Sequence, residues 1–227
     1  MILRERPSPN HDARPGDGVI DMLVLHYTGM PTAEEALDRL CDADAAVSAH
    51  YLIEEDGTLW RLVRENRRAW HAGVAYWRGH TDINARSIGI ELVNPGHEHG
   101  YRRFPDAQMM TLETLARDLL AEYRIPARNV VGHSDVAPVR KCDPGELFDW
   151  RRLAAAGIGL WPAVPMSSTA GDEQAAALLD RIGYQVEGDG ALAAAVTAFQ
   201  RRFLPDRMSG QPCTMTLRTL RALTVLL

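Results

Sequence analysis

The sequence has few cysteines, no long apolar run and no excess of positive charge. Only three of its 227 residues are cysteines, and Cys41, Cys142 and Cys213 lie far apart. An odd number of widely spaced cysteines is a poor disulfide framework and is typical of reduced thiols. No stretch reaches the roughly 18 apolar residues of a membrane-spanning helix, so we expect no membrane insertion.

Nucleic-acid binding and a secretory signal are also not indicated. The formal net charge is −5 and the pI is near 5.9, so no broad basic surface is available to a nucleic-acid backbone. The first seven residues lack the apolar stretch and small-residue cleavage site of a signal peptide. We therefore expect a cytoplasmic protein. The periplasm or cell envelope is the alternative, reached by another export route or from a different start codon.

Apolar patterns in residues 1–156 predict an α/β domain, with a central mixed β-sheet flanked by helices. Residues 1–20 are rich in Pro and Gly and predict an irregular lead-in. Strands are expected over 22–25, 49–53, 59–63, 87–93 and 130–131, and helices over 32–40, 106–123 and 148–156. The Asp56-Gly57 pair predicts a hairpin between the second and third of these strands.

A second unit is expected after a linker. Residues 157–171 contain Gly157, Pro162, Pro165 and a Ser167-to-Thr169 run, which is linker composition. Beyond it, residues 172–227 show three helical patterns, over 176–182, 192–203 and 217–227. The sequence thus predicts an α/β domain over 1–156 and a small all-α three-helix domain over 172–227.

Two histidines and one aspartate form a candidate metal site. His26 and His133 each end a predicted strand, and Asp143 follows His133 by ten residues. Two imidazoles and one carboxylate are a recurring ligand set of catalytic zinc, which keeps its fourth position for water. The alternative for each residue is a structural one, because strand-end histidines are commonly hydrogen-bonded and Asp143 precedes a proline in a turn.

Hydrolysis at such a site also needs a base and a group that stabilises the developing oxyanion. Glu91 is the candidate base, since alternation in its strand places Ile88 and Ile90 on the opposite face. Lys141 lies two residues from Asp143 and is the candidate donor to the oxyanion. The alternatives are a solvent-facing carboxylate and an exposed loop cation.

Six short motifs occur in a fixed order along roughly residues 20 to 155. They are 24–29 (VLHYTG), 48–53 (SAHYLI), 69–73 (AWHAG), 87–92 (SIGIEL), 132–138 (GHSDVAP) and 141–145 (KCDPG). Together they make the chain resemble the type 2 N-acetylmuramoyl-L-alanine amidases, a zinc family related to peptidoglycan recognition proteins. The resemblance implies His26, His133 and Asp143 as ligands of Zn²⁺, Glu91 as the general base and Lys141 as the oxyanion stabiliser.

The same resemblance implies the reaction. The expected activity is hydrolysis of the amide between N-acetylmuramic acid, or its 1,6-anhydro form, and L-alanine of the stem peptide, in wall turnover or recycling. Intact peptidoglycan and soluble anhydro-muropeptides are both candidate substrates, and no obligate protein partner is implied. The alternative is a non-catalytic peptidoglycan-binding module, which characteristically lacks part of the ligand set.

The C-terminal motifs 178–184 (LLDRIGY) and 195–203 (AVTAFQRRF) resemble a small three-helix peptidoglycan-binding domain. The chain departs from that pattern at Ser209-Gly210, where an acidic residue usually precedes the glycine. The departure puts glycan affinity in doubt. The alternative is a helical appendage that stabilises the fold and binds no ligand.

Further residues of the motifs are candidates for substrate contact. We expect Tyr27 and His71 to line the groove, with packing beneath the site as the alternative for His71, and Trp70 and Trp77 to form an aromatic wall or to pack in the core. Outside this set, His97 and His99 fall in a Gly-bounded segment and are expected to be solvated loop residues. Cys142 is expected to be an inert buried thiol, with a competing ligand role as the alternative.

Overall fold

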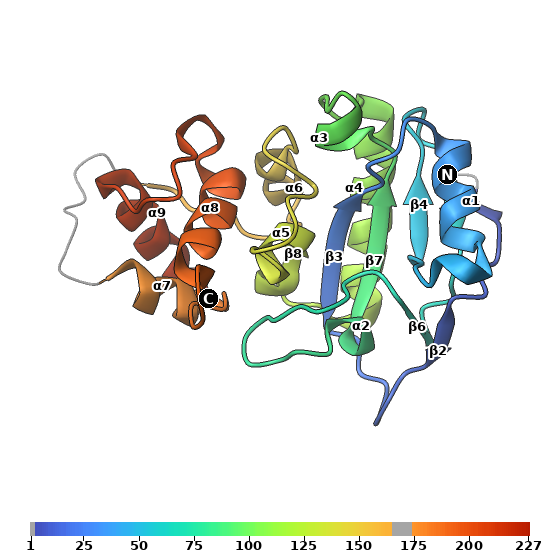
Figure 1. The fold of residues 1–227 in the computed structure, drawn as a ribbon, viewed down its shortest axis with the longest axis horizontal. Helices are drawn as coiled ribbons and strands as arrows, with labels where there is room; N and C mark the ends of the chain where they lie inside the picture. The colour runs from blue at the N-terminus through green and yellow to red at the C-terminus, as the bar shows by residue number, and fades with distance from the viewer. Residues whose placement is uncertain (1–2, 165–173) are drawn as a thin grey trace.

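The protein is built on a six-stranded sheet with helices on both faces (Figure 1), in a computed structural model that describes residues 3–164 and 174–227. The strand order is β1-β5-β4-β7-β3-β8. The bounds are β1 Leu3–Glu5, β5 Leu59–Arg61, β4 Tyr51–Ile53, β7 Ser87–Leu92, β3 Met22–Tyr27 and β8 Val130–Gly132. Strands β4, β7, β3 and β8 run parallel, whereas β4 and β5 form the antiparallel hairpin. The predicted mixed sheet is confirmed.

Helices connect and cover the strands. In chain order they are α1 Ala33–Cys41, α2 Ile83–Arg86, α3 Gly96–His99, α4 Asp106–Tyr123, α5 His133–Val136, α6 Trp150–Ala155, α7 Ala175–Ile182, α8 Ala191–Phe203 and α9 Thr214–Thr224. Short 3-10 turns span Ala43–Ala45, Ala127–Asn129 and Pro205–Arg207. None of the helices within the described ranges is long and apolar enough to cross a membrane.

The two faces of the sheet are buried by different helices. Leu23 and Leu25 of β3 pack with Ile88 and Ile90 of β7 against α4, the helix predicted over 106–123. Met22 and Val24 of β3 point the other way, because side chains alternate along a strand. They share an apolar cluster with the C-terminal helices, whose members include Leu178, Leu179, Ala195, Val196, Phe199 and Phe203. Figure 1 shows α7, α8 and α9 gathered beyond β8, next to α5.

Two predictions of irregular structure are wrong. The N-terminal lead-in contains β1 and also β2, His11–Ala13, which pairs antiparallel with β6, Arg67–Ala69. Both early strands are only three residues long and expose much of their surface, so they carry no apolar alternation. The segment around His97 forms α3 and ends at Gly100 in the left-handed conformation. The Ser167-to-Thr169 part of the predicted linker lies outside the described residues.

Candidate active site

Three adjacent strands deliver the site residues to one edge of the sheet. In the parallel pairing of β3 with β7, His26 lies opposite Glu91, and in that of β3 with β8, Leu25 lies opposite Gly132. His133 therefore emerges beside His26 at the carboxyl ends of the strands. In open α/β sheets this edge is where ligands commonly bind.

His26, His133 and Asp143 converge on one point. His26 Nδ1 lies 3.0 Å from His133 Nδ1 and 3.0 Å from Asp143 Oδ2, and His133 Nδ1 lies 3.1 Å from the same oxygen. All three side chains are buried. A tetrahedral zinc with bonds of about 2.0–2.1 Å separates its ligands by about 3.3 Å. The spacing thus suits a small cation with nitrogen and oxygen ligands, and this trio is the cluster of possible metal ligands in the described part of the chain.

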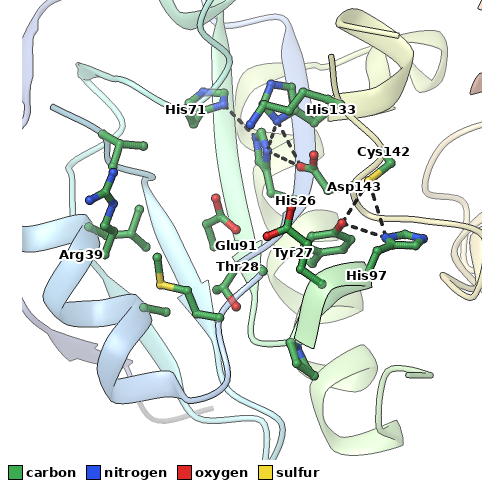
Figure 2. A pocket seen from close by; sticks show the side chains of 18 of the residues that line it. His26, Tyr27, Thr28, Arg39, His71, Glu91, His97, His133, Cys142 and Asp143 are labelled. Carbon is green, nitrogen blue, oxygen red and sulfur yellow. Dashed lines mark hydrogen bonds and ion pairs between the residues drawn. The ribbon is translucent and has the colours of Figure 1, made fainter. Parts of the chain in front are cut away.

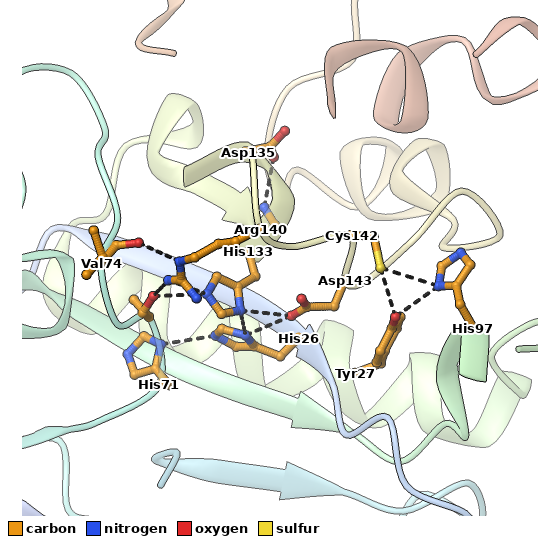
Figure 3. Close-up of polar contacts among 12 residues, drawn as sticks. His26, Tyr27, His71, Val74, His97, His133, Asp135, Arg140, Cys142 and Asp143 are labelled. Atoms are coloured by element: carbon orange, nitrogen blue, oxygen red, sulfur yellow. Dashed lines mark hydrogen bonds and ion pairs between the residues drawn. The ribbon is translucent and has the colours of Figure 1, made fainter. Parts of the chain in front are cut away.

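A chain of hydrogen bonds determines which nitrogen of His26 carries the proton (Figure 3). Ser87 Oγ donates to the carbonyl of Ile83 at 2.7 Å, so it must accept from His71 Nε2 at 3.1 Å. His71 Nδ1 is then an acceptor and receives the hydrogen of His26 Nε2 at 3.0 Å. His26 Nδ1 is left with a free lone pair that points at His133 and Asp143.

The imidazole of His133 has the same tautomer as that of His26. His133 Nε2 lies 3.0 Å from the carbonyl oxygen of Ala72, which can only accept, so this nitrogen carries the hydrogen. Arg140 donates to the same carbonyl and, at 2.8 Å, to that of Val74. Both imidazoles thus present a bare Nδ1 to the cluster, the form in which histidine binds a metal.

Burial and neighbouring charge set the protonation of the cluster. Burial, reinforced by His133, lowers the pKa of His26 to about 4, so its imidazole is neutral at physiological pH. Burial alone raises the pKa of Asp143, but His133 and His26 outweigh it and hold that pKa well below its ordinary value. The site therefore offers a neutral nitrogen of His26 and an anionic oxygen of Asp143, which are the protonation states that metal binding needs.

The cluster forms the end of a cavity of about 440 Å³ that also contains Glu91 and Lys141 (Figure 2). Glu91 Oε2 is buried and has no hydrogen-bond partner among the described residues. Burial raises the pKa of Glu91 well above its ordinary value, Asp143 raises it further, and Lys141 opposes the shift. A carboxylate with a raised pKa and a free oxygen is suited to accept a proton from water.

Comparison with known proteins settles the family. Residues 16–146 match the family described as N-acetylmuramoyl-L-alanine amidase. The chain belongs to the N-acetylmuramoyl-L-alanine amidase family. It is 38% identical to N-acetylmuramoyl-L-alanine amidase AmiD of Escherichia coli, over 85% of this chain and 78% of that protein. It is 39% identical to 1,6-anhydro-N-acetylmuramyl-L-alanine amidase AmpD of Salmonella typhimurium, over 67% of this chain and 88% of the relative.

Solved structures agree with the fold of this amidase over most of its length. The complex of E. coli AmiD with the substrate anhydro-N-acetylmuramic acid-L-Ala-D-gamma-Glu-L-Lys superposes with a TM-score of 0.82 at 36% identity, over 95% of this chain and 92% of that one. AmpDh3 of Pseudomonas aeruginosa gives a TM-score of 0.81 at 32% identity, over 97% and 95%. The C-terminal helices are therefore included in the similarity.

The residues expected to contact substrate fall into two groups. Tyr27 and His71 line the cavity of the amidase, with His71 packed behind His26. Trp70 and Trp77 do not line it. Trp77 is 3% exposed, and its ring packs edge-on against Tyr184 with centroids 5.1 Å apart. For Trp77 the geometry therefore favours the alternative of core packing, because the C-terminal helices cover it.

Two cavity residues of the amidase were not anticipated. His97 stacks on Tyr101, with ring centroids 4.3 Å apart, and its Nδ1 lies 2.9 Å from Tyr27 Oη. The prediction of a loop is thus wrong for His97, which lies on α3 and contacts β3, whereas its side chain is exposed as expected. Arg39 on α1 lines the opposite side of the cavity (Figure 2). Nothing in its helical spacing distinguishes Arg39 from a solvated arginine.

Cys142 lies beside Asp143 in sequence but faces away from the cluster (Figure 3). Its Sγ lies 3.1 Å from Tyr27 Oη and 3.5 Å from His97 Nδ1. The thiol is only partly buried, and it does not belong to the group of possible metal ligands. The geometry favours the carboxylate of Asp143 over this thiol as the third ligand.

Proposed function

We propose that this amidase hydrolyses the amide between N-acetylmuramic acid, in its 1,6-anhydro form, and L-alanine of the stem peptide, using a zinc ion held by His26, His133 and Asp143. The observation that carries the proposal is the cluster of two bare Nδ1 atoms and one carboxylate oxygen at the end of the cavity that contains Glu91. AmiD with an anhydro-muropeptide and AmpD supply the substrate class.

The chain's own residues supply the proton transfers and the positioning. Zinc held by His26, His133 and Asp143 would lower the pKa of a bound water and polarise a carbonyl. Glu91 accepts the proton of the attacking water at Oε2 and returns it to the departing amine of L-alanine. Lys141, which lines the same cavity, donates to the oxyanion that develops on the attacked carbonyl. His71 and the carbonyl of Ala72 hold the two imidazoles in the required tautomer.

Mass spectrometry of the products tests the proposal. The purified protein is incubated with anhydro-muropeptides and, separately, with intact sacculi, each with and without a chelator. The expected result is chelator-sensitive release of a peptide with a free L-alanine amine, faster from the soluble anhydro-muropeptide. Failure of zinc-loaded protein to cut either substrate would instead favour a non-catalytic peptidoglycan-binding module.

The domain assignment and the glycan-binding role of residues 172–227 are part of the same proposal. Helices α7 to α9 lie within this range. Gln200 Oε1 accepts from the backbone of Ser209 and of Gly210, each at 2.9 Å, so the segment that departs from the expected pattern is held in place. Sedimentation of the full chain with sacculi, in the presence of chelator to suppress cleavage, tests this role. The cytoplasmic location, with the cell envelope as alternative, stays a prediction that cell fractionation tests.

A further inference from the structure

The carboxylate of Asp135, two residues after His133, is buried at the contact between the sheet and the C-terminal helices. Its side chain is 1% exposed. Asp135 Oδ2 accepts from the backbone N–H of Gly132 at 2.8 Å, across the turn that carries His133 (Figure 3). The remaining bonds of this carboxylate come from residues far along the chain. The turn that carries His133 therefore depends on hydrogen bonds from the C-terminal region as well as on its own backbone.

Arg202 of α8 provides the first of these bonds. Arg202 Nη1 lies 2.7 Å from Asp135 Oδ2, and Nη2 donates to the carbonyl of Val130 at 3.1 Å. One guanidinium thus contacts the first residue of β8 and a side chain of α5, on either side of His133. The side chain of Arg202 is only 7% exposed, so the ion pair lies where solvent screening is weak.

Tyr184, which follows α7, provides the second bond. Its hydroxyl donates to Asp135 Oδ1 at 2.5 Å, and its side chain is 1% exposed. Burial and the charge of Asp135 raise the pKa of Tyr184 well above its ordinary value, so the hydroxyl keeps its hydrogen. The ring also packs on Trp77 and Phe199, which fixes its direction.

The same support reaches the segment that carries Asp143. The guanidinium of Arg202 lies over the ring of Trp150, 3.8 Å from its centroid. A Cβ placed on Gly132 would lie 3.3 Å from that ring and 2.7 Å from Pro144, so these groups are in close contact with Gly132. The backbone N–H of Ser134 donates to the carbonyl of Asp143 at 2.9 Å. Both ligand-bearing segments are thus packed into one unit beneath Arg202.

We infer that the C-terminal helices act as a clamp on the metal site: Arg202 and Tyr184 are positioning residues that hold Asp135 and thereby keep His133 at ligand distance from His26 and Asp143. The inference rests on the proposed function, because it assigns these contacts to the proposed metal site. It gives residues 172–227 a role in the metal site that is separate from any affinity for glycan.

Zinc affinity and the visible spectrum of the cobalt-loaded protein test the clamp in the full chain. Loss of an outer partner of a metal ligand commonly weakens metal binding by about 10–100-fold. Arg202 acts on His133 through Asp135, one contact further out, so we expect a loss of about 10-fold, at the low end of that range, for Arg202→Gln. Tyr184→Phe, which removes only the hydroxyl, should weaken binding less. Arg207→Gln, at an exposed arginine of the same C-terminal region, is the matched control and should leave zinc affinity unchanged.

The cobalt spectrum separates positioning from general destabilisation, since it reports the ligand geometry of protein that is folded. We expect altered ligand-field bands in Arg202→Gln and partial recovery in Arg202→Lys. The double variant Asp135→Asn/Arg202→Gln should lose no more zinc affinity than whichever of the two single variants loses more, because the two groups act as a pair.

Folded variants with wild-type zinc affinity and wild-type cobalt spectrum would overturn the clamp while leaving the proposed function intact. If Arg202→Gln does not fold, Tyr184→Phe and Arg202→Lys are judged by the same criterion. Wild-type protein that binds no zinc would overturn the proposed function, and the clamp with it.

Discussion

The imidazole of His26 and the carboxylate of Glu91, the candidate base, lie on neighbouring strands but have opposite environments. On β3, Nε2 of His26 is held by His71, and its bare Nδ1 lies 3.0 Å from Asp143 Oδ2 in the ligand cluster. On β7, directly opposite in the register, Glu91 Oε2 is buried without a partner among the described residues. The ligands are thus held before any metal arrives, whereas the base keeps a free oxygen for the reacting water.

Burial lowers the stability of the folded protein at Glu91 but not at His26. A hydrogen-bonded buried imidazole costs little, whereas leaving a buried polar group unpaired costs about 1–3 kcal/mol. Desolvation accordingly raises the pKa of Glu91. Unfavourable burial of this kind is concentrated at functional sites, where the strained group has a task in the reaction. Four substitutions test whether the contrast between the two strands is functional.

Glu91→Ala should have the largest effect. Since only the proton-handling group is removed, we expect kcat to fall by about 10²–10⁴-fold, the usual contribution of general acid–base catalysis. Zinc content should stay at the wild-type level, because Glu91 is not in the ligand cluster. Product release measured by mass spectrometry, together with metal analysis of the same sample, checks both parts. A fully active variant would refute the assignment of the base.

Asp143→Ala should act on the metal instead. The site loses its only anionic ligand, and we expect zinc affinity to fall by more than about 100-fold, beyond the effect of losing an outer partner. Competition with a chromophoric chelator measures the change. Unchanged zinc affinity would contradict the ligand role. Asp149→Asn, at an exposed aspartate six residues further along the chain, controls for loss of a nearby negative charge, because asparagine keeps the oxygen that caps α6.

Substitution of His71 tests the hydrogen bond that orients His26, and its expected effect on zinc affinity is smaller. His71→Leu removes the acceptor for His26 Nε2, and we expect zinc affinity to fall by about 10–100-fold. In His71→Asn the amide oxygen takes the place of Nδ1, so most of the affinity should return. Nitrogen-15 NMR of the metal-free wild type should show His26 protonated at Nε2 and bare at Nδ1. The opposite tautomer would contradict the hydrogen-bond chain through Ser87.

Sequence patterns predict the sheet well where strands are buried on both faces. The apolar run of β3, the Asp56-Gly57 hairpin and the helix over 106–123 are all present. The strands β1 and β2 were missed, because short strands with exposed side chains carry no periodic signal. Patterns of this kind record local burial, and they contain no information on pairing between distant segments.

The environment of His71 shows the same limit within the site. Its motif marks it as a site residue, but its position behind His26 depends on Gly89 of β7, where a Cβ would lie 2.5 Å from the His71 ring. A glycine inside a strand often marks such a close approach, and this signal was available in the sequence. The burial of Trp77 had none, since it depends on Tyr184, more than a hundred residues away.

The smallest expected effect concerns the unpaired carboxylate of Glu91, and it appears in the stability of the protein rather than in the rate of hydrolysis. Glu91→Gln replaces the ionisable carboxyl at nearly constant shape, so at pH above the raised pKa of Glu91 the metal-free variant should be more stable than the wild type, by about 1 kcal/mol. Urea unfolding of both proteins measures the difference. Glu98→Gln, at an exposed glutamate of the same cavity, should change nothing.

The pH dependence gives this prediction its sign. Because burial raises the pKa of Glu91 in the folded state, the folded wild type binds more protons than the unfolded chain at any pH between the ordinary glutamate pKa of about 4.3 and the raised value. Wild-type stability therefore rises, relative to Glu91→Gln, as pH falls through the raised pKa. The advantage of the variant should be largest above that pKa and should shrink until pH reaches about 4.3. A constant advantage at every pH would mean that packing, and not the buried charge, separates the two proteins.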